Sequence, residues 1–205
     1  MGILASWFSK EDLLLAEAEF NKDMVSSVYG HFSSEDARAY RAIVRTIRNG
    51  AIAELGVYMG RSATTIAPIC KENECRLYCV DSWNEVPGHK EWRQGSYDEP
   101  MVEFNKNIAA IGCQDIVEAI RMNTNAAAEL VKQRGLLFDL VFIDASHEYA
   151  DVKKDIAMWS PLVKPGGFIM GHDYCDRWES VRQAVDESFD GKAHLISGWV
   201  WGIKK

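Results

Sequence analysis

From residue 51 onward, short apolar runs alternate with longer stretches in which apolar residues recur at helical spacing. Short apolar runs predict strands, and periodic stretches predict helices. We expect strands at residues 51–55, 76–80, 116–120, 138–143 and 166–170, helices at residues 61–71, 100–111, 124–133, 150–162 and 178–189, and two short strands around Gly198. This alternation predicts βαβ units and a parallel sheet. The continuous apolar run at 138–143 predicts a strand buried on both faces.

Two further helices are predicted ahead of the first strand, at residues 10–30 and 33–48. Ser9 is a candidate cap for the first helix, and Asn49 with Gly50 is a typical stop for the second. We therefore predict a single domain over residues 1–205, in which residues 1–49 form an N-terminal helical extension and residues 50–205 form the core. The extension either covers a binding site or pairs with another subunit.

Composition narrows the functional class. The chain has 205 residues, is 47% hydrophobic and carries a net charge of -7. It is long enough to bury a core and lacks the basic face that is typical of nucleic-acid binders. No apolar run reaches the ~18 residues of a membrane span, and no secretory signal begins the chain. We expect a cytoplasmic protein without a nucleic-acid or membrane partner. The five cysteines form no C-x-x-C pair, which argues against a disulfide framework or a zinc site.

The turn after the first strand has the features of a ligand site. The strand ends near Glu54, Gly56 and Gly60 follow, and the next helix begins near Ser62. Glycines let the backbone approach a ligand, and a helix start offers N–H groups and a positive dipole end. An ordinary strand-to-helix turn shares these features. The G-x-G-x-x-G spacing of NAD enzymes is absent, and Glu54 would repel a pyrophosphate but suit a cation. S-adenosylmethionine, with an ammonium and a sulfonium, therefore fits better than a dinucleotide.

The next two strand ends supply candidate contacts to a nucleoside. Asp81 lies 25 positions after Gly56, near the usual spacing for an acid that accepts hydrogen bonds from ribose hydroxyls. Trp83 would either stack on adenine or serve as a core aromatic residue. Asn123 would either reach the adenine amino group or cap the following helix.

The fourth and fifth strands, neighbours in the expected sheet, end in ionisable residues. Asp144 and His147 follow the fourth strand, and His172 and Asp173 follow the fifth. Two carboxylates with an imidazole suit a divalent cation, and carboxylates favour hard ions such as Mg²⁺ or Mn²⁺. His147 would act as a general base near neutral pH. In the alternative interpretation, Asp144 only caps the next segment and His147 makes a structural hydrogen bond.

Four segments together resemble class I S-adenosylmethionine-dependent methyltransferases. They are residues 54–63 (ELGVYMGRSA), 80–83 (VDSW), 138–149 (FDLVFIDASHEY) and 164–174 (KPGGFIMGHDY). The resemblance spans residues 50–205 and is nearest to the small-molecule O-methyltransferases that include the macrocin and mycinamicin sugar enzymes. It implies an α/β, Rossmann-like, doubly wound seven-stranded sheet in the order 3-2-1-4-5-7-6, with strand seven antiparallel and helices on both faces.

The resemblance also implies roles for individual residues. It implies catalytic roles for Asp144 and His147, with His147 as the base. It implies a divalent-ion site at Asp144, His172 and Asp173, although His172 stands where metal-dependent members carry an acid. The implied contacts to S-adenosylmethionine are Glu54, Gly56, Tyr58, Gly60, Arg61, Ser62, Asp81, Ser82, Trp83, Asn123, Asp144 and His147.

The predicted reaction is methyl transfer from S-adenosylmethionine to a hydroxyl of a small molecule, with divalent-metal assistance at the strand ends. The alternatives are a metal-independent small-molecule N- or O-methyltransferase, a catalytically silent cofactor-binding protein and an NAD-linked oxidoreductase. Residues 82–98 and the N-terminal helices are expected to shape the acceptor pocket. Trp92, Tyr97 and Trp178 either line that pocket or form a subunit contact in a homodimer or higher homo-oligomer.

Overall fold

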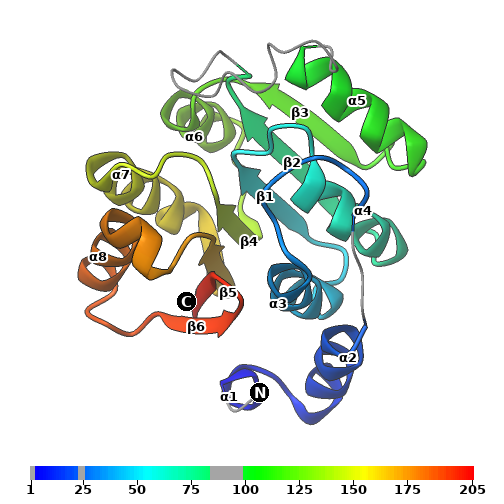
Figure 1. Cartoon of the computed structure of the whole chain (residues 1–205). Coiled ribbons are helices and arrows are strands. Elements are labelled where there is room, and N and C mark those ends of the chain that lie inside the picture. The colour runs from blue at the N-terminus through cyan, green and yellow to red at the C-terminus, as the bar shows by residue number, and fades with distance from the viewer. Residues whose placement is uncertain (1–2, 23–25, 84–98) are drawn as a thin grey trace.

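Seven strands form one sheet in the order β3-β2-β1-β4-β5-β7-β6 (Figure 1). The structure is a computed structural model that describes residues 3–22, 26–83 and 99–205. Five strands run parallel, and β7 is antiparallel to both β5 and β6. The predicted sheet order and the antiparallel seventh strand are therefore confirmed. The strands are β1 (Ala51–Leu55), β2 (Arg76–Asp81), β3 (Val117–Arg121), β4 (Phe138–Ile143), β5 (Val163–Gly171), β6 (His194–Ser197) and β7 (Val200–Lys204).

Helices cover both faces of the sheet (Figure 1). One layer holds α3 (Ser34–Arg45), α4 (Arg61–Glu72) and α5 (Pro100–Ala110), and the other holds α6 (Thr124–Gln133), α7 (Tyr149–Trp159) and α8 (Glu179–Ser188). Side chains alternate across a strand, so Ile52 packs in the apolar cluster of the first layer and Ala53 in that of the second. The predicted helix at 150–162 is α7 followed by a 3₁₀ turn, Ser160–Leu162, because Pro161 has no N–H to continue the helix.

The N-terminal extension differs from its prediction. A short helix, α1 (Leu4–Trp7), precedes α2 (Lys10–Phe20). The side chain of Ser9 caps α2 as expected, by accepting the N–H of Asp12. The prediction of a helix reaching residue 30 is wrong, because α2 ends at Phe20 and residues 26–32 form no helix. Serine and glycine in this stretch disfavour a helix, and its backbone carbonyls bind the core instead.

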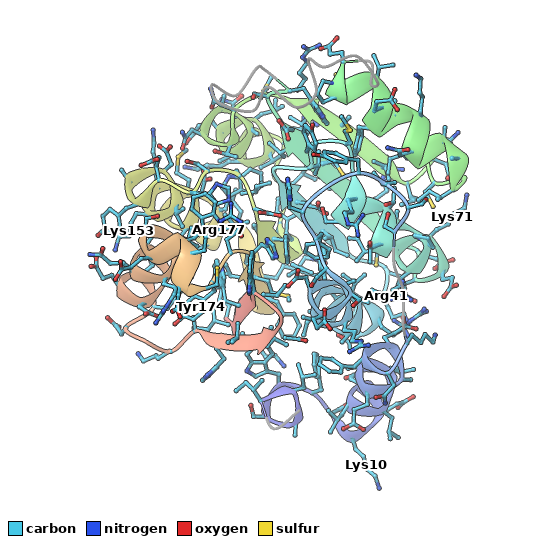
Figure 2. All side chains as sticks on the ribbon, viewed as in Figure 1. Lys10, Arg41, Lys71, Lys153, Tyr174 and Arg177 are labelled. Atoms are coloured by element: carbon cyan, nitrogen blue, oxygen red, sulfur yellow. The ribbon has the colours of Figure 1, made fainter. Side chains whose placement is uncertain are left out.

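A buried ion cluster attaches α2 to α3. Glu19 is 2% exposed and pairs with Arg41, with Arg45 at 2.9 Å and with Lys22 at 2.6 Å; Arg41 is labelled in Figure 2. Burial raises the pKa of Glu19, but these three cations together bring it below its usual value. Removing one partner of such a buried pair is strongly destabilising, so this cluster firmly fixes α2 to α3.

No helix in the described ranges has the length and apolar character needed to cross a membrane. The cysteines are free thiols. The cytoplasmic location, the homo-oligomeric state and the lack of a nucleic-acid partner stay predictions. Trp92 and Tyr97, predicted either to line the acceptor pocket or to form a subunit contact, lie outside the described residues, as does the rest of residues 84–98 of the predicted pocket loop.

Candidate active site

A cavity of about 620 Å³ lies at the carboxyl ends of the strands. In open α/β sheets the ligand sits at this edge, where the strand order reverses. Glu54 and Gly60 are not among the residues that line the cavity. The predicted site residues that line it are Gly56, Tyr58, Arg61, Ser62, Asp81, Ser82, Trp83, Asn123, Asp144, His147, His172 and Asp173.

The turn between β1 and α4 brings backbone to the cavity. Gly56 has a φ of 80°, and a Cβ atom there would lie 2.0 Å from the carbonyl oxygen of Asp144. Only glycine fits this close approach. Arg61 and Ser62, in the first turn of α4, line the cavity. The positive end of a helix dipole attracts anions, so this turn suits a ligand carboxylate.

Glu54 lies directly behind this turn and is fully buried. The hydroxyl of Ser62 donates to one of its oxygens, and Tyr40 donates to the other at 3.1 Å. Burial raises the pKa of Glu54 to about 8, with further contributions from Asp144 and Asp81. A cation bound nearby would favour the ionised carboxylate again.

Asp81 connects the ends of β1 and β2. One of its oxygens accepts the N–H groups of Val57 at 3.0 Å and Tyr58 at 2.9 Å, and the other accepts that of Trp83 at 2.7 Å. Tyr58 and Trp83 both have left-handed φ angles, 47° and 46°, a conformation that costs energy for such residues. Asp81 therefore stabilises the backbone around the cavity as well as lining it.

The nucleoside candidates combine structural and lining roles. The indole N–H of Trp83 donates to the carbonyl of Tyr58 at 2.7 Å, and its ring packs on Phe104. The side chain of Asn123 caps α6 by accepting the N–H of Ala126 at 2.9 Å. Both residues still line the cavity, so their roles as adenine contacts stay predictions.

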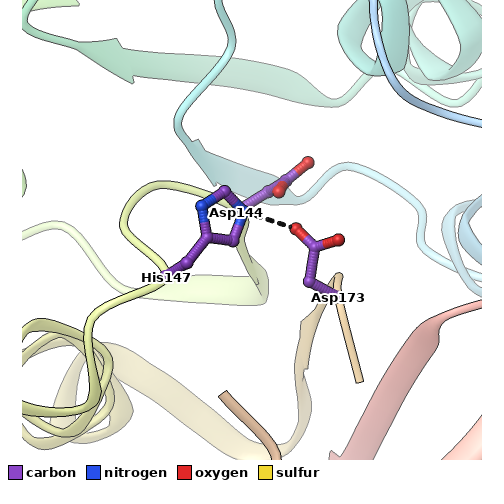
Figure 3. Close-up of side chains that lie close together, drawn as sticks. All are labelled: Asp144, His147 and Asp173. Atoms are coloured by element: carbon purple, nitrogen blue, oxygen red, sulfur yellow. Dashed lines mark hydrogen bonds and ion pairs between the residues drawn. The ribbon is translucent and has the colours of Figure 1, made fainter. Parts of the chain in front are cut away.

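His147 and Asp173 form a hydrogen-bonded pair at the far end of the cavity, beside Asp144 (Figure 3). The Nε2 atom of His147 lies 2.7 Å from a carboxylate oxygen of Asp173. The imidazole also stacks on Trp178, with ring centroids 4.0 Å apart. The hydrogen bond to Asp173 raises the pKa of His147. The His147 ring is therefore oriented and basic, as a proton acceptor requires.

His172 lies behind this pair and is buried. Its Nδ1 atom is 3.7 Å from Asp144 and 3.5 Å from Asp173. Burial lowers the pKa of His172, but Asp144, Asp173 and Asp36 raise it to about 11. The ring is therefore an imidazolium that faces both carboxylates. Burial still raises the pKa of Asp144 to about 7, so a further cation in the cavity would stabilise its ionised form.

The N-terminal extension contributes to the site in two ways: the contact of Asp36 escaped the sequence prediction, whereas the lining by residues 29–32 agrees with an extension that covers a binding site. Asp36 contacts His172 from α3, with 3.1 Å between Oδ2 and Nε2. Residues 29–32 line the cavity, and Arg61 holds this segment by donating to the carbonyls of Ser26, Val28 and Phe32. The only local signal was the helix start at residues 33–36, which predicts a cap and no contact with the core.

The comparisons with known proteins agree with this architecture. The family described as a methyltransferase domain matches residues 53–174, which is more than half of the chain. No curated protein matches the chain significantly.

Three solved structures have similar folds. The apo structure of CalS11, a TDP-rhamnose 3'-O-methyltransferase of calicheamicin biosynthesis, has a TM-score of 0.63 and 16% identity, covering 82% of this chain and 76% of that one. An O-methyltransferase from Bacillus cereus in complex with SAH has a TM-score of 0.60 and 14% identity, covering 98% and 100%. Cofactor-bound Rv0187 from MTB has a TM-score of 0.60 and 16% identity, covering 95% and 89%.

At these identities the solved structures establish the fold alone, whereas the family match covers the β1 turn, Asp81 and the ends of β4 and β5. The chain belongs to the methyltransferase domain family, and its fold is that of class I S-adenosylmethionine-dependent methyltransferases.

Proposed function

We propose that the protein transfers the methyl group of S-adenosylmethionine to a hydroxyl of a small molecule. The observation that carries this proposal is the His147–Asp173 pair in the cavity, which would supply an oriented base. A hydroxyl attached to carbon is a weak nucleophile, so its proton must be removed as the oxygen attacks. The O-methyltransferase titles among the similar structures are consistent with this chemistry.

The cofactor is proposed to lie across the cavity, from the β1 turn to Asp144. Its methionine carboxylate would face the start of α4 at Ser62, and its ribose would lie near Asp81. Glu54 would face the ammonium group through the turn. The cofactor's positive charges would also favour ionised Asp144, whose pKa is raised by burial in the ligand-free chain. These positions leave the methyl group between the nucleoside and His147.

The reaction is an in-line displacement. A lone pair of the acceptor oxygen forms the new bond to the methyl carbon, the carbon–sulfur bond breaks, and its electron pair stays on the sulfur of S-adenosylhomocysteine. His147 donates Nε2–H to Asp173, so Nδ1 is the nitrogen that accepts the hydroxyl proton. The sulfonium is already reactive, so positioning the two partners supplies much of the rate.

The same residues have the donor chemistry for a divalent ion. Asp144, His147 and Asp173 each offer a ligand atom, and these atoms lie within 4.8 Å of one another. Two carboxylates and an imidazole suit Mn²⁺ or another transition metal better than Mg²⁺. A bound ion would lower the pKa of the acceptor hydroxyl. The predicted ligand His172 is not part of this group, and its ring is protonated in the ion-free chain, so it would have to release a proton to bind an ion.

We favour the metal-independent form of the reaction. The His172 imidazolium already lies near Asp144 and Asp173, where a divalent ion would meet a like charge. An ion would also take Nε2 of His147 away from Asp173. The metal-assisted form is the second candidate, because the three donor atoms are close enough to bind one ion.

An acceptor panel tests the proposed function. The purified enzyme is incubated with S-adenosylmethionine and one of four acceptor types: a catechol, a simple phenol, a nucleotide sugar such as TDP-rhamnose, or a primary amine. Mass spectrometry of the product locates the added methyl group. Methylation of oxygen supports the proposal. Methylation of the amine nitrogen alone would replace it with an N-methyltransferase, and no product from any acceptor class would favour a silent cofactor-binding protein.

A further inference from the structure

Asp36 is a buried carboxylate in the first turn of α3, outside the strand-end motifs. It is 3% exposed. Its Oδ2 atom accepts the backbone N–H of Ser33 at 2.8 Å and the Ser33 hydroxyl at 2.7 Å. In return, the backbone N–H of Asp36 donates to the Ser33 hydroxyl at 3.2 Å, which completes a capping box. A cap alone needs no burial, so its position beneath the sheet edge calls for a further explanation.

Two other segments meet the same carboxylate. The backbone N–H of Trp199 donates to Oδ1 of Asp36 at 2.7 Å. A Cβ atom at Gly198 would lie 2.1 Å from that oxygen, so glycine is required for this approach. His172, at the end of β5, brings Nε2 to 3.1 Å from Oδ2. Asp36 thus joins the extension to the β6–β7 turn and to the edge of the active site.

The contacts continue from Asp36 to the base. His172 touches Asp36 through Nε2 and faces Asp173 through Nδ1, and Asp173 accepts the hydrogen bond of His147. Carboxylates and imidazoles therefore alternate along Asp36, His172, Asp173 and His147. Burial raises the pKa of Asp36, but His172, Ser33 and Trp199 lower it to about 2.

We propose that Asp36 is a positioning residue for methyl transfer, which fixes the His172 ring so that Asp173 stays aligned with His147. The ring of His172 can rotate about its side-chain bonds, and the ion pair with Asp36 holds one edge of it. The opposite edge then faces Asp144 and Asp173. In this way the N-terminal extension completes the catalytic core. This inference rests on the proposed function, in which His147 is the base.

The test compares Asp36→Asn with Ser33→Ala. Asparagine at position 36 keeps an acceptor for Trp199 but loses the charge that pairs with His172. Ser33→Ala weakens the same capping box and leaves that charge in place. Two-dimensional NMR of the histidine rings, recorded at one pH, reports on His147 without requiring an acceptor. Turnover is measured with the acceptor that the panel identifies, and S-adenosylhomocysteine affinity by calorimetry.

The expected result separates positioning from stability. Asp36→Asn moves the ring signals of His147, which Asp36 does not touch, and lowers kcat by about tenfold or more. The acceptor KM and the affinity for S-adenosylhomocysteine change by less than about twofold, because the β1 turn is untouched. Ser33→Ala lowers the melting temperature but leaves the His147 signals and kcat unchanged.

Combining Asp36→Asn with His172→Gln tests whether Asp36 acts through His172. Because Asp36 acts through His172, Asp36→Asn lowers kcat no further in a His172→Gln background; multiplied losses would overturn the proposal. Unchanged His147 signals with unchanged kcat in Asp36→Asn would also overturn it. If Asp36→Asn does not fold, Gly198→Ala displaces the same carboxylate and gives the same readouts. Failure of both variants to fold would assign Asp36 to stability alone.

His147→Ala, assayed in parallel, distinguishes a failure of the Asp36 proposal from a failure of the proposed role of His147 as the base. If it loses turnover while Asp36→Asn keeps it, only the role of Asp36 is wrong. If His147→Ala keeps turnover, the base assignment itself fails.

Discussion

The cavity has a proposed cofactor end, at the β1 turn and Asp81, and a proposed acceptor end, at Asp144, His147 and Asp173. Different groups stabilise the carboxylates at the two ends. At the cofactor end, Glu54 and Asp81 are held by hydroxyls and backbone N–H groups from segments close in sequence or in the sheet. At the acceptor end, Asp144 and Asp173 face imidazoles from two strand ends. Hydroxyl and backbone donors build a rigid ligand turn, whereas imidazoles can move protons. Under the proposed function, this difference separates cofactor binding from methyl transfer along one cavity.

If cofactor binding and methyl transfer are separated in this way, the largest loss of kcat comes from a substitution at the acceptor end. His147→Ala is expected to lower kcat by roughly 100-fold or more, because the base that takes the acceptor proton is lost. The affinity for S-adenosylhomocysteine, measured by calorimetry, should stay within about twofold, because the proposed contacts to its carboxylate and ribose, at Ser62 and Asp81, are unchanged. His194→Ala, at an exposed position on β6, is the matched control and should leave both values unchanged. Equal losses of affinity and turnover in His147→Ala would contradict the proposed division between cofactor binding and catalysis.

At the cofactor end the opposite pattern is expected. Asp81→Asn removes an acceptor of the Val57 and Tyr58 N–H groups and of the proposed ribose contact. It should weaken S-adenosylhomocysteine binding by about tenfold or more, while kcat at saturating cofactor changes little. Asp176→Asn makes the same charge change at an exposed site and should leave affinity intact. Unchanged affinity in Asp81→Asn would show that the ribose lies elsewhere.

Glu54 predicts a pH dependence of stability in the ligand-free enzyme. Its pKa is about 8 when folded and near its usual 4.5 when unfolded. Between these values the folded state keeps a proton that the unfolded state has released, so stability falls as pH rises. The Glu54→Gln variant lacks this ionisable group, so its free energy of unfolding should fall less steeply with pH than that of the unchanged chain. The two slopes should differ by up to about 1.4 kcal/mol per pH unit. Urea unfolding at pH 5, 6 and 7 measures both slopes; parallel slopes would mean that Glu54 ionises normally.

Removal of divalent ions by a chelator should have the smallest effect on kcat. Because His172 supplies positive charge near Asp144 and Asp173, we expect kcat to stay within about twofold after exhaustive EDTA treatment and desalting. A large loss that Mn²⁺ or Mg²⁺ restores would place an ion among Asp144, His147 and Asp173. It would also move His147 from the role of base to that of ligand.

The cofactor end could be predicted from the sequence because its determinants are local. Gly56 and Ser62 follow β1 within a few residues and Asp81 ends the next strand, whereas Gly60, which was predicted with them, does not line the cavity. The period of the apolar residues gave the strands, and the resemblance gave their order. Trp83 and Asn123 show the limit of such an interpretation, since each is both a structural contact and a lining residue.

The acceptor end could be predicted only in part. Asp144, His147, His172 and Asp173 were found because they end neighbouring strands. Asp36 was missed because its role depends on a contact with His172 across 136 sequence positions, whereas locally it is only a helix cap. The early end of α2 was missed because the carbonyls of Ser26 and Val28 bind Arg61, a tertiary contact that helical periodicity does not encode.

The division between the two ends is tested most directly by a crystal structure of the enzyme with S-adenosylhomocysteine. The account predicts the homocysteine carboxylate at the start of α4, the ribose beside Asp81 and the sulfur directed toward the space between Asp144 and His147. A cofactor whose sulfur points away from His147, or whose ribose lies at the acceptor end, would contradict it.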